Sequence, residues 1–137
     1  MLPFVHECLI RVRYVETDQM GIVWHGNYLQ YFEEARTETM RACGWSYRAL
    51  EESGVMMPLT EVHLNYLKPA RYDDCLSIRV TVTEPPTARM RFDYEIRNTA
   101  NSELLVTGHT ILGFMNATTR RPCRPPQQFR AMFAPSA

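Results

Sequence analysis

Residues 14–42 read YVETDQMGIVWHGNYLQYFEEARTETMRA and divide into a polar loop and a helix. The loop contains Gly21, which is typical of a turn. From Asn27 onward, small or apolar side chains recur at steps of three and four residues, which predicts an amphipathic helix: Tyr28, Tyr31, Phe32, Ala35, Thr39 and Ala42. Asn27 as N-cap with Gln30 three residues later matches a capping box, and Gly44 can end the helix in a left-handed conformation.

Segments of alternating polarity lie on both sides of this helix. Residues 8–15, CLIRVRYV, place every second side chain up to Tyr14 on one apolar face, which predicts a strand. After the helix, Ser46 and Gly54 can bound a second, shorter helix. Four more strands are expected in the second half of the chain, at residues 62–66, 76–82, 90–96 and 104–115.

The order of these segments predicts an α+β fold, with an antiparallel sheet of about five strands wrapped around one long helix. Residues 1–137 form one domain of ordinary size, and the proline-rich tail after about residue 118 is expected to be irregular. The reverse face of the sheet still carries apolar side chains. A second copy of the chain is the natural cover, so we expect a homo-oligomer.

Composition excludes several classes of protein. Fifteen Lys and Arg residues balance fifteen Asp and Glu residues, so there is no basic excess for a nucleic-acid partner. No apolar run approaches the roughly 20 residues that cross a bilayer, and the N-terminus does not read as a signal peptide. The motifs GxGxxG, GxxxxGK[ST] and GxSxG are absent, which leaves nucleotide-cofactor, P-loop and serine-hydrolase functions without support.

The cysteines and histidines do not form a metal motif. The four cysteines contain no CxxC pair, and the histidines contain no HExxH pattern. We therefore expect no metal and no cofactor. Scattered cysteines of this kind are typical of reduced thiols, which indicates a cytoplasmic protein.

The loop gathers groups that suit acyl transfer. Asp18 lies near Gly21, and His25 lies just before the helix, whose amino end offers unpaired backbone amides and a positive dipole end to a developing oxyanion. A carboxylate, an imidazole and a helix N-terminus together form a plausible catalytic site. Taken one by one, Asp18 can equally cap a turn and His25 can be an ordinary surface or core histidine.

The run TDQMGIVWHGNYLQYFEEAR resembles the signature of the hotdog-fold acyl-CoA thioesterases. The resemblance is strongest to the 4-hydroxybenzoyl-CoA thioesterase-like branch, which includes the Tol-Pal-associated thioesterases. The features that match are Asp18, Gly21, Trp24, His25, Tyr28, Glu33, Ala35 and Arg36. A second block, residues 65–74, NYLKPARYDD, also resembles the family. Gln19 and Met20 depart from the small residues that often follow the aspartate.

The resemblance implies hydrolysis of an acyl-CoA thioester to a carboxylic acid and CoA. It makes Asp18 the general base or the nucleophile, gives His25 a part in orienting water or the carbonyl and in proton transfer, and gives Tyr14 a positioning role. Backbone amides from His25 through Gly26 to Asn27 would hold the thioester oxygen.

The resemblance also implies how substrate is bound. The acyl group would run along the helix and the sheet interior, lined by Trp24, Tyr28, Tyr31, Met56 and Met57. Lys68, Arg71 and Arg91 are candidates for the CoA phosphates because each is a cation near a strand end or face, and each can equally be a solvated surface charge. The site would lie between two subunits of a dimer or tetramer.

Two other functions fit a chain of this family. One is a hotdog dehydratase or hydratase, whose usual histidine and acidic-residue pattern differs from the spacing of Asp18 and His25 in this sequence. The other is a non-catalytic hotdog protein that binds acyl-CoA, against which the presence of both residues argues. Both rest on analogy of fold alone.

Overall fold

The computed structural model describes residues 2–135. Its main feature is a five-stranded antiparallel sheet with the strand order β1-β4-β5-β6-β3, which confirms the expected sheet. The strands are β1 (Phe4–Arg11), β3 (Leu59–Tyr66), β4 (Cys75–Val82), β5 (Arg89–Asn98) and β6 (Leu104–Gly113). Strands β1 and β3 are the two edge strands. The Asp18 loop follows β1 and the other segment follows β3, so the two start from opposite edges of the sheet.

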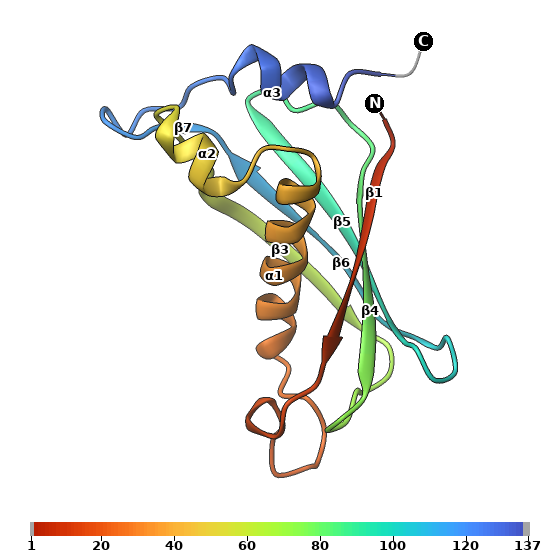
Figure 1. Cartoon of the computed structure of the whole chain (residues 1–137). Coiled ribbons are helices and arrows are strands. Elements are labelled where there is room, and N and C mark those ends of the chain that lie inside the picture. The colour runs from red at the N-terminus through yellow and green to blue at the C-terminus, as the bar shows by residue number, and fades with distance from the viewer. Residues whose placement is uncertain (1, 136–137) are drawn as a thin grey trace.

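The sixteen-residue helix α1 (Asn27–Ala42) lies across one face of this sheet (Figure 1). Its buried side includes Phe32, whose ring stacks on Tyr94 of β5 with the ring centres 4.0 Å apart. Gly44 follows the helix with φ of +89°, the left-handed conformation that the sequence predicted. The N-cap is Gly26 rather than Asn27, because the Asn27 side-chain amide donates to the backbone oxygen of Glu16 instead.

Strand β1 lies further toward the N-terminus than residues 8–15. Its pairing with β4 ends where Arg11 meets Cys75, the first residue of β4, so no partner strand extends beyond that point. Val12 is still buried, but Tyr14 lies in the 3₁₀ turn η1 (Tyr14–Glu16), with 76% of its surface exposed. The strand predicted through Tyr14 is therefore corrected to one that ends at Arg11.

The tail after residue 118 contains more structure than expected. Helix α3 (Gln127–Met132) covers the end of the sheet away from the Asp18 loop (Figure 1). Phe129 and Phe133, four residues apart, are completely buried, and this shared face explains why a helix forms there. Pro126 sits at the N-cap, where a proline does not interrupt the helix.

Smaller elements complete the chain. Helix α2 (Tyr47–Glu52) begins as predicted, because the Ser46 side-chain oxygen accepts a hydrogen bond from the Ala49 amide. Strands β2 (Val55–Met56) and β7 (Met115–Asn116) pair in a two-stranded sheet. None of the helices within residues 2–135 has the length and apolar character needed to span a membrane.

Candidate active site

The loop of residues 17–26 has a defined conformation that positions Asp18. The Gly21 amide donates to the Asp18 backbone oxygen at 3.0 Å, and the turn closes with Gly21 at φ of +78°. One carboxylate oxygen of Asp18, Oδ1, accepts a hydrogen bond from the Met20 amide at 2.8 Å. The other oxygen, Oδ2, has no hydrogen-bond partner in the described part of the chain. Asp18 therefore caps its own turn and still offers a free carboxylate oxygen.

The loop is joined to the segment that links β3 to β4. The Val23 amide donates to the Ala70 backbone oxygen at 2.9 Å, and Ile22 forms an isolated β-bridge with Arg71. These contacts bring two segments together that are about fifty residues apart in the sequence. The space between them is the cavity described next.

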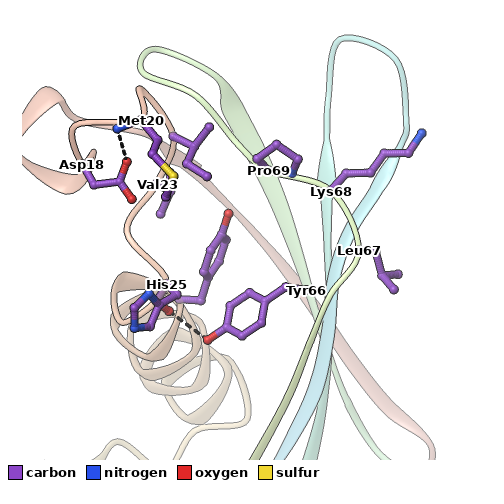
Figure 2. Close-up of a pocket in the computed structure, with 10 residues that line it drawn as sticks. Asp18, Met20, Val23, His25, Tyr66, Leu67, Lys68 and Pro69 are labelled. Atoms are coloured by element: carbon purple, nitrogen blue, oxygen red, sulfur yellow. Dashed lines mark hydrogen bonds between the residues drawn. The ribbon is translucent and has the colours of Figure 1, made fainter.

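Asp18 and His25 line the same cavity, which has a volume of about 290 Å³ (Figure 2). One wall comes from the loop and the start of α1, and the other comes from the end of β3 and the residues after it. The remaining lining residues are Met20, Ile22, Val23, Tyr28, Tyr66, Leu67, Lys68 and Pro69. A mostly apolar cavity with a carboxylate at one side suits an apolar group attached to a reactive polar one.

The amino end of α1 supplies free hydrogen-bond donors beside this cavity. The backbone amides of His25 and Gly26 have no acceptor anywhere within residues 2–135, whereas the Asn27 amide donates to the Trp24 oxygen at 2.9 Å. The first turn of α1 contains no acidic residue, so nothing there neutralises the positive end of the helix dipole. Two of the three amides expected to hold an oxyanion are thus available, and Asn27 is not.

Gly26 is required by close packing rather than by its backbone angles. A Cβ atom at this position would lie 2.4 Å from the nearest ring carbon of Trp24. The Trp24 ring also lies against His25, with the ring centres 5.1 Å apart, and half of Trp24 is exposed. Trp24 therefore covers the start of the helix outside the cavity lining.

Tyr28 and Tyr66 form the inner wall of the cavity. The Tyr66 hydroxyl donates to the backbone oxygen of His25 at 3.0 Å, which ties the end of β3 to the start of α1 (Figure 2). The Tyr28 hydroxyl accepts a hydrogen bond from the Ala70 amide at 3.3 Å. Burial raises the pKa of Tyr28, so its phenol stays protonated at neutral pH.

The family model described as "Thioesterase-like superfamily" matches residues 12–133, nearly the whole described chain and both walls of the cavity. The chain belongs to this superfamily. It is a thioester hydrolase, and the resemblance drawn from the loop and helix sequence is confirmed.

Relatives and a solved structure agree with this assignment. YneP of Bacillus subtilis is 36% identical over 91 residues, which are 66% of each chain. The acyl-CoA thioester hydrolase YbgC of Escherichia coli is 31% identical over 124 residues, which are 90% of this chain and 92% of YbgC. A DHNA-CoA thioesterase structure from Staphylococcus aureus superposes with a TM-score of 0.83 at 35% identity, over 88% of this chain and 80% of that one. The fold of this thioesterase is the hotdog fold.

Besides Trp24, three more of the expected acyl-contact and positioning residues lie outside the cavity lining of this thioesterase. Tyr14 packs its exposed ring against Tyr72, with the centres 5.6 Å apart. Tyr31 is buried and points its hydroxyl at the Glu16 carboxylate. Met57 lines a separate hollow of about 130 Å³ between α2 and the short strands. Sequence spacing placed these side chains near the helix or the loop, but it did not indicate the direction in which each one points.

The three expected phosphate-binding cations have different surroundings. Lys68 lines the cavity, and its ammonium group forms an ion pair with Glu103 at 2.7 Å. Arg71 lies beside the loop, and its guanidinium has no partner among the described residues. Arg91 lies elsewhere, on β5, where it pairs with Asp93 at 3.0 Å. Of these three cations, Lys68 alone lines the cavity, and the Arg71 backbone is bridged to Ile22, one of the lining residues.

Sequence reasoning did not assign Tyr66 or Glu16 to the site. Tyr66 occurs in the second block of family resemblance, and that block was the signal that could have identified it. Glu16 stands two residues before Asp18 and has no pattern of its own. Its role depends on contacts with Tyr31 and Asn27 that only the folded chain shows.

Proposed function

We propose that this thioesterase hydrolyses acyl-CoA, with Asp18 as the reacting carboxylate. The observation that carries the proposal is the free Asp18 Oδ2 atom in a chain segment that shares an apolar cavity with His25, beside the unneutralised amino end of α1. The alternative of a non-catalytic binder gives no reason for a carboxylate at an apolar cavity. The alternative of a dehydratase or hydratase is tested by the product, because that reaction leaves the thioester intact.

The chemistry needs few groups. Asp18 either takes a proton from water that attacks the thioester carbon, or attacks that carbon itself and forms an anhydride that water then hydrolyses. In both routes a C–O bond forms and the C–S bond breaks. A thiol has a pKa of about 8.5, so CoA leaves as a thiolate without a strong acid. His25 orients the water or the carbonyl and assists proton transfer.

The oxyanion formed during attack is stabilised by the start of α1. The amides of His25 and Gly26 are free to donate, and the helix dipole favours negative charge at this end. These donors are held in place before substrate binds, because the Tyr66 hydroxyl donates to the His25 backbone oxygen and the Asn27 amide donates to the Trp24 backbone oxygen. A preorganised pair of amides is the main source of transition-state stabilisation in this proposal.

The cavity and its rim indicate the substrate. Its volume of about 290 Å³ and its apolar walls fit a medium-chain or aromatic acyl group. Lys68 lines the cavity, and Arg71, whose guanidinium has no partner among the described residues, follows three residues later in the same segment, so the phosphates of CoA would lie on this side. Relatives of this chain are named for acyl-CoA and DHNA-CoA, which supports CoA as the leaving group.

The proposal extends to the whole protein. The chain is one hotdog domain with the sheet wrapped around α1, and it works as a homodimer or homotetramer whose subunits share the site. The open edge strand β3, with Val62 and Tyr66 exposed, supports this assembly. The four cysteines are unpaired, which supports a reducing, cytoplasmic location. Burial raises the pKa of Cys8 to about 11, so that thiol does not compete as nucleophile.

A thiol-release assay tests the proposal. Wild-type protein is mixed with short, long and aromatic acyl-CoAs, and free CoA is measured. We expect Asp18→Asn to lower turnover by about 10² or more, because the amide is neither a base nor a nucleophile. The asparagine oxygen can still accept from the Met20 amide, so the turn is kept. Asp93→Asn, outside the cavity, is the control, and near wild-type turnover of Asp18→Asn would remove Asp18 from the mechanism.

A further inference from the structure

Glu16 is a buried carboxylate next to the active-site loop. Only 8% of its side chain is exposed. Its Oε1 atom accepts hydrogen bonds from the Tyr31 hydroxyl at 2.9 Å and from the Arg13 amide at 2.8 Å, and its Oε2 atom pairs with Arg13 Nε at 3.2 Å. Burying a carboxylate is costly unless it is paired and hydrogen-bonded, and these three contacts offset that cost for Glu16.

The backbone of Glu16 closes the loop that follows it. Its carbonyl oxygen accepts hydrogen bonds from the Trp24 amide at 2.9 Å and from the Asn27 side-chain amide at 2.7 Å. The chain between these contacts is the loop of residues 17–26, which carries both Asp18 and His25. The loop therefore begins at Glu16 and returns to it.

The side chain connects this closed loop to α1. Tyr31 is on α1 and is 1% exposed, and its hydroxyl donates its hydrogen bond to the Glu16 carboxylate. Burial and the hydrogen bond to Glu16 both raise the pKa of Tyr31, so the phenol remains a donor. Neither Glu16 nor Tyr31 lines the Asp18 cavity, and both instead line a separate hollow with Arg13, Gln30, Glu33 and Glu34. Any effect of this pair on catalysis must therefore act through the loop.

We propose that Glu16 is a positioning residue for thioester hydrolysis, which with Tyr31 and Asn27 fixes the loop of residues 17–26 against α1 so that Asp18 and the His25 amide meet the thioester. The proposal rests on the function proposed above. It also gives Tyr31 a role different from the acyl contact expected from sequence. A displacement of about 1 Å in a reacting group can cost about 10² in rate, so a loosened loop is expected to lower kcat more than binding.

The test compares two hydrogen-bonded tyrosine hydroxyls, one buried and one half-buried. Tyr31→Phe removes the donor to Glu16, whereas Tyr47→Phe removes a hydroxyl that accepts from Arg36 Nε at 2.6 Å, away from the loop. We expect Tyr31→Phe to lower kcat about tenfold with KM nearly unchanged, and Tyr47→Phe to leave kcat unchanged even if both lower the unfolding temperature. Glu16→Ala removes the contacts with Arg13 as well as with Tyr31 and is expected to lower kcat by about 10². Adding Tyr31→Phe to it should cost little more, since the Tyr31–Glu16 contact is then already lost.

A second readout follows the loop without reference to turnover. Hydrogen exchange of the amides in residues 17–26 should become faster in Tyr31→Phe and Glu16→Ala and stay at the wild-type rate in Tyr47→Phe. Glu16→Gln, which keeps an acceptor oxygen for Tyr31, should restore part of both kcat and protection. If wild type is active and both kcat and loop exchange are unchanged in Tyr31→Phe and Glu16→Ala, the positioning role is refuted and the proposed function stands. Wild type that releases no thiol from any acyl-CoA would refute the proposed function, and the positioning role with it.

Discussion

Asp18 combines two tasks that the sequence presented as alternatives. Its Oδ1 atom caps the turn through the Met20 amide, and its Oδ2 atom remains free. The turn contact orients the carboxylate, so the second oxygen has a defined direction without help from another side chain. His25 differs, because the structure fixes its backbone oxygen through Tyr66 but gives its imidazole no hydrogen-bond partner among residues 2–135.

This difference predicts unequal effects of the two side chains. His25→Ala keeps the backbone amide and the Tyr66 contact, so turnover should fall by about tenfold, less than for Asp18→Asn. Steady-state thiol release at several pH values is the measurement, and His109→Ala on β6, outside the cavity, is the control. A loss equal to or larger than that of Asp18→Asn would make His25 the principal base.

The sequence could predict which residue types meet at the site, but only partly their directions. Asp18 and His25 are seven residues apart on one loop, so local spacing and family resemblance were enough to place them together. Tyr31, Met57 and Arg91 depend on contacts between elements, and the chain brings each to a different hollow or partner. Periodicity shows that a side chain leaves its backbone on one face, but not which neighbour it then meets.

The N-cap of helix α1 is Gly26, where the absence of a side chain is required by packing. Gly26 has φ of −70° and ψ of −22°, angles that alanine adopts easily, so only the nearby Trp24 ring restricts this position. The helix start is thus coupled to Trp24 by packing. Because the free amides of His25 and Gly26 lie there, a shift of Trp24 would also disturb the donors of the proposed oxyanion site.

Gly26→Ala is therefore expected to lower kcat about 10-fold to 10²-fold, because its Cβ would overlap the Trp24 ring. Thiol release measures the loss. Gly113→Ala is the matched control, since a Cβ there meets only ordinary contacts, the nearest at 3.8 Å. The double variant Gly26→Ala with Trp24→Ala should recover part of the activity. Wild-type kcat in Gly26→Ala would contradict the coupling.

The sheet has a similar close approach between β3 and β6. A Cβ at Gly108 would lie 2.3 Å from the His63 backbone oxygen and 2.9 Å from the Phe32 ring. Because one obstacle is backbone, the strands themselves must move. Gly108→Ala should lower the free energy of unfolding by about 2 kcal/mol or more, as overpacked cores do, while Gly113→Ala changes it little. Denaturant titration decides, and equal stability of the two variants would contradict this packing.

Element boundaries were harder to predict than element types. The alternation of β4 and β5 was clear from sequence, since their buried residues fall at every second position. The end of β1 depends on where β4 begins, and α3 depends on a buried surface for Phe129 and Phe133. Both depend on partner segments that only the folded chain brings together. The end of β1 was therefore predicted too late in the sequence, and the segment of α3 was predicted to be irregular.

At the scale of the whole molecule, the two edge strands of the sheet, β3 and β1, differ in how exposed their side chains are. Along β3 the side chains are exposed except for the half-buried Leu64, and Val62 and Tyr66 are among them. Along β1, exposed positions alternate with half-buried ones, and Ile10 is buried. An exposed edge with apolar side chains is a site where a second copy can add strands.

A dimer or tetramer is therefore expected by light scattering at assay concentration. Val62→Lys should shift the protein toward monomer and lower turnover, because a charge on the edge opposes pairing and the proposed site is shared. Leu9→Lys on β1, an exposed position at the other edge, is the control. An active monomer would overturn the shared site.

The bond between the Val23 amide and the Ala70 oxygen joins a reactive loop to a segment that contributes mainly walls. Mutations in residues 67–70 can thus reshape the room for an acyl chain while leaving the carboxylate and the helix start in place. Part of the cavity wall is therefore separate in sequence from the loop that carries Asp18 and His25, although Met20, Ile22, Val23 and Tyr28 complete the lining. Members of such a family can therefore change the acyl group that they bind before they change the reaction that they catalyse.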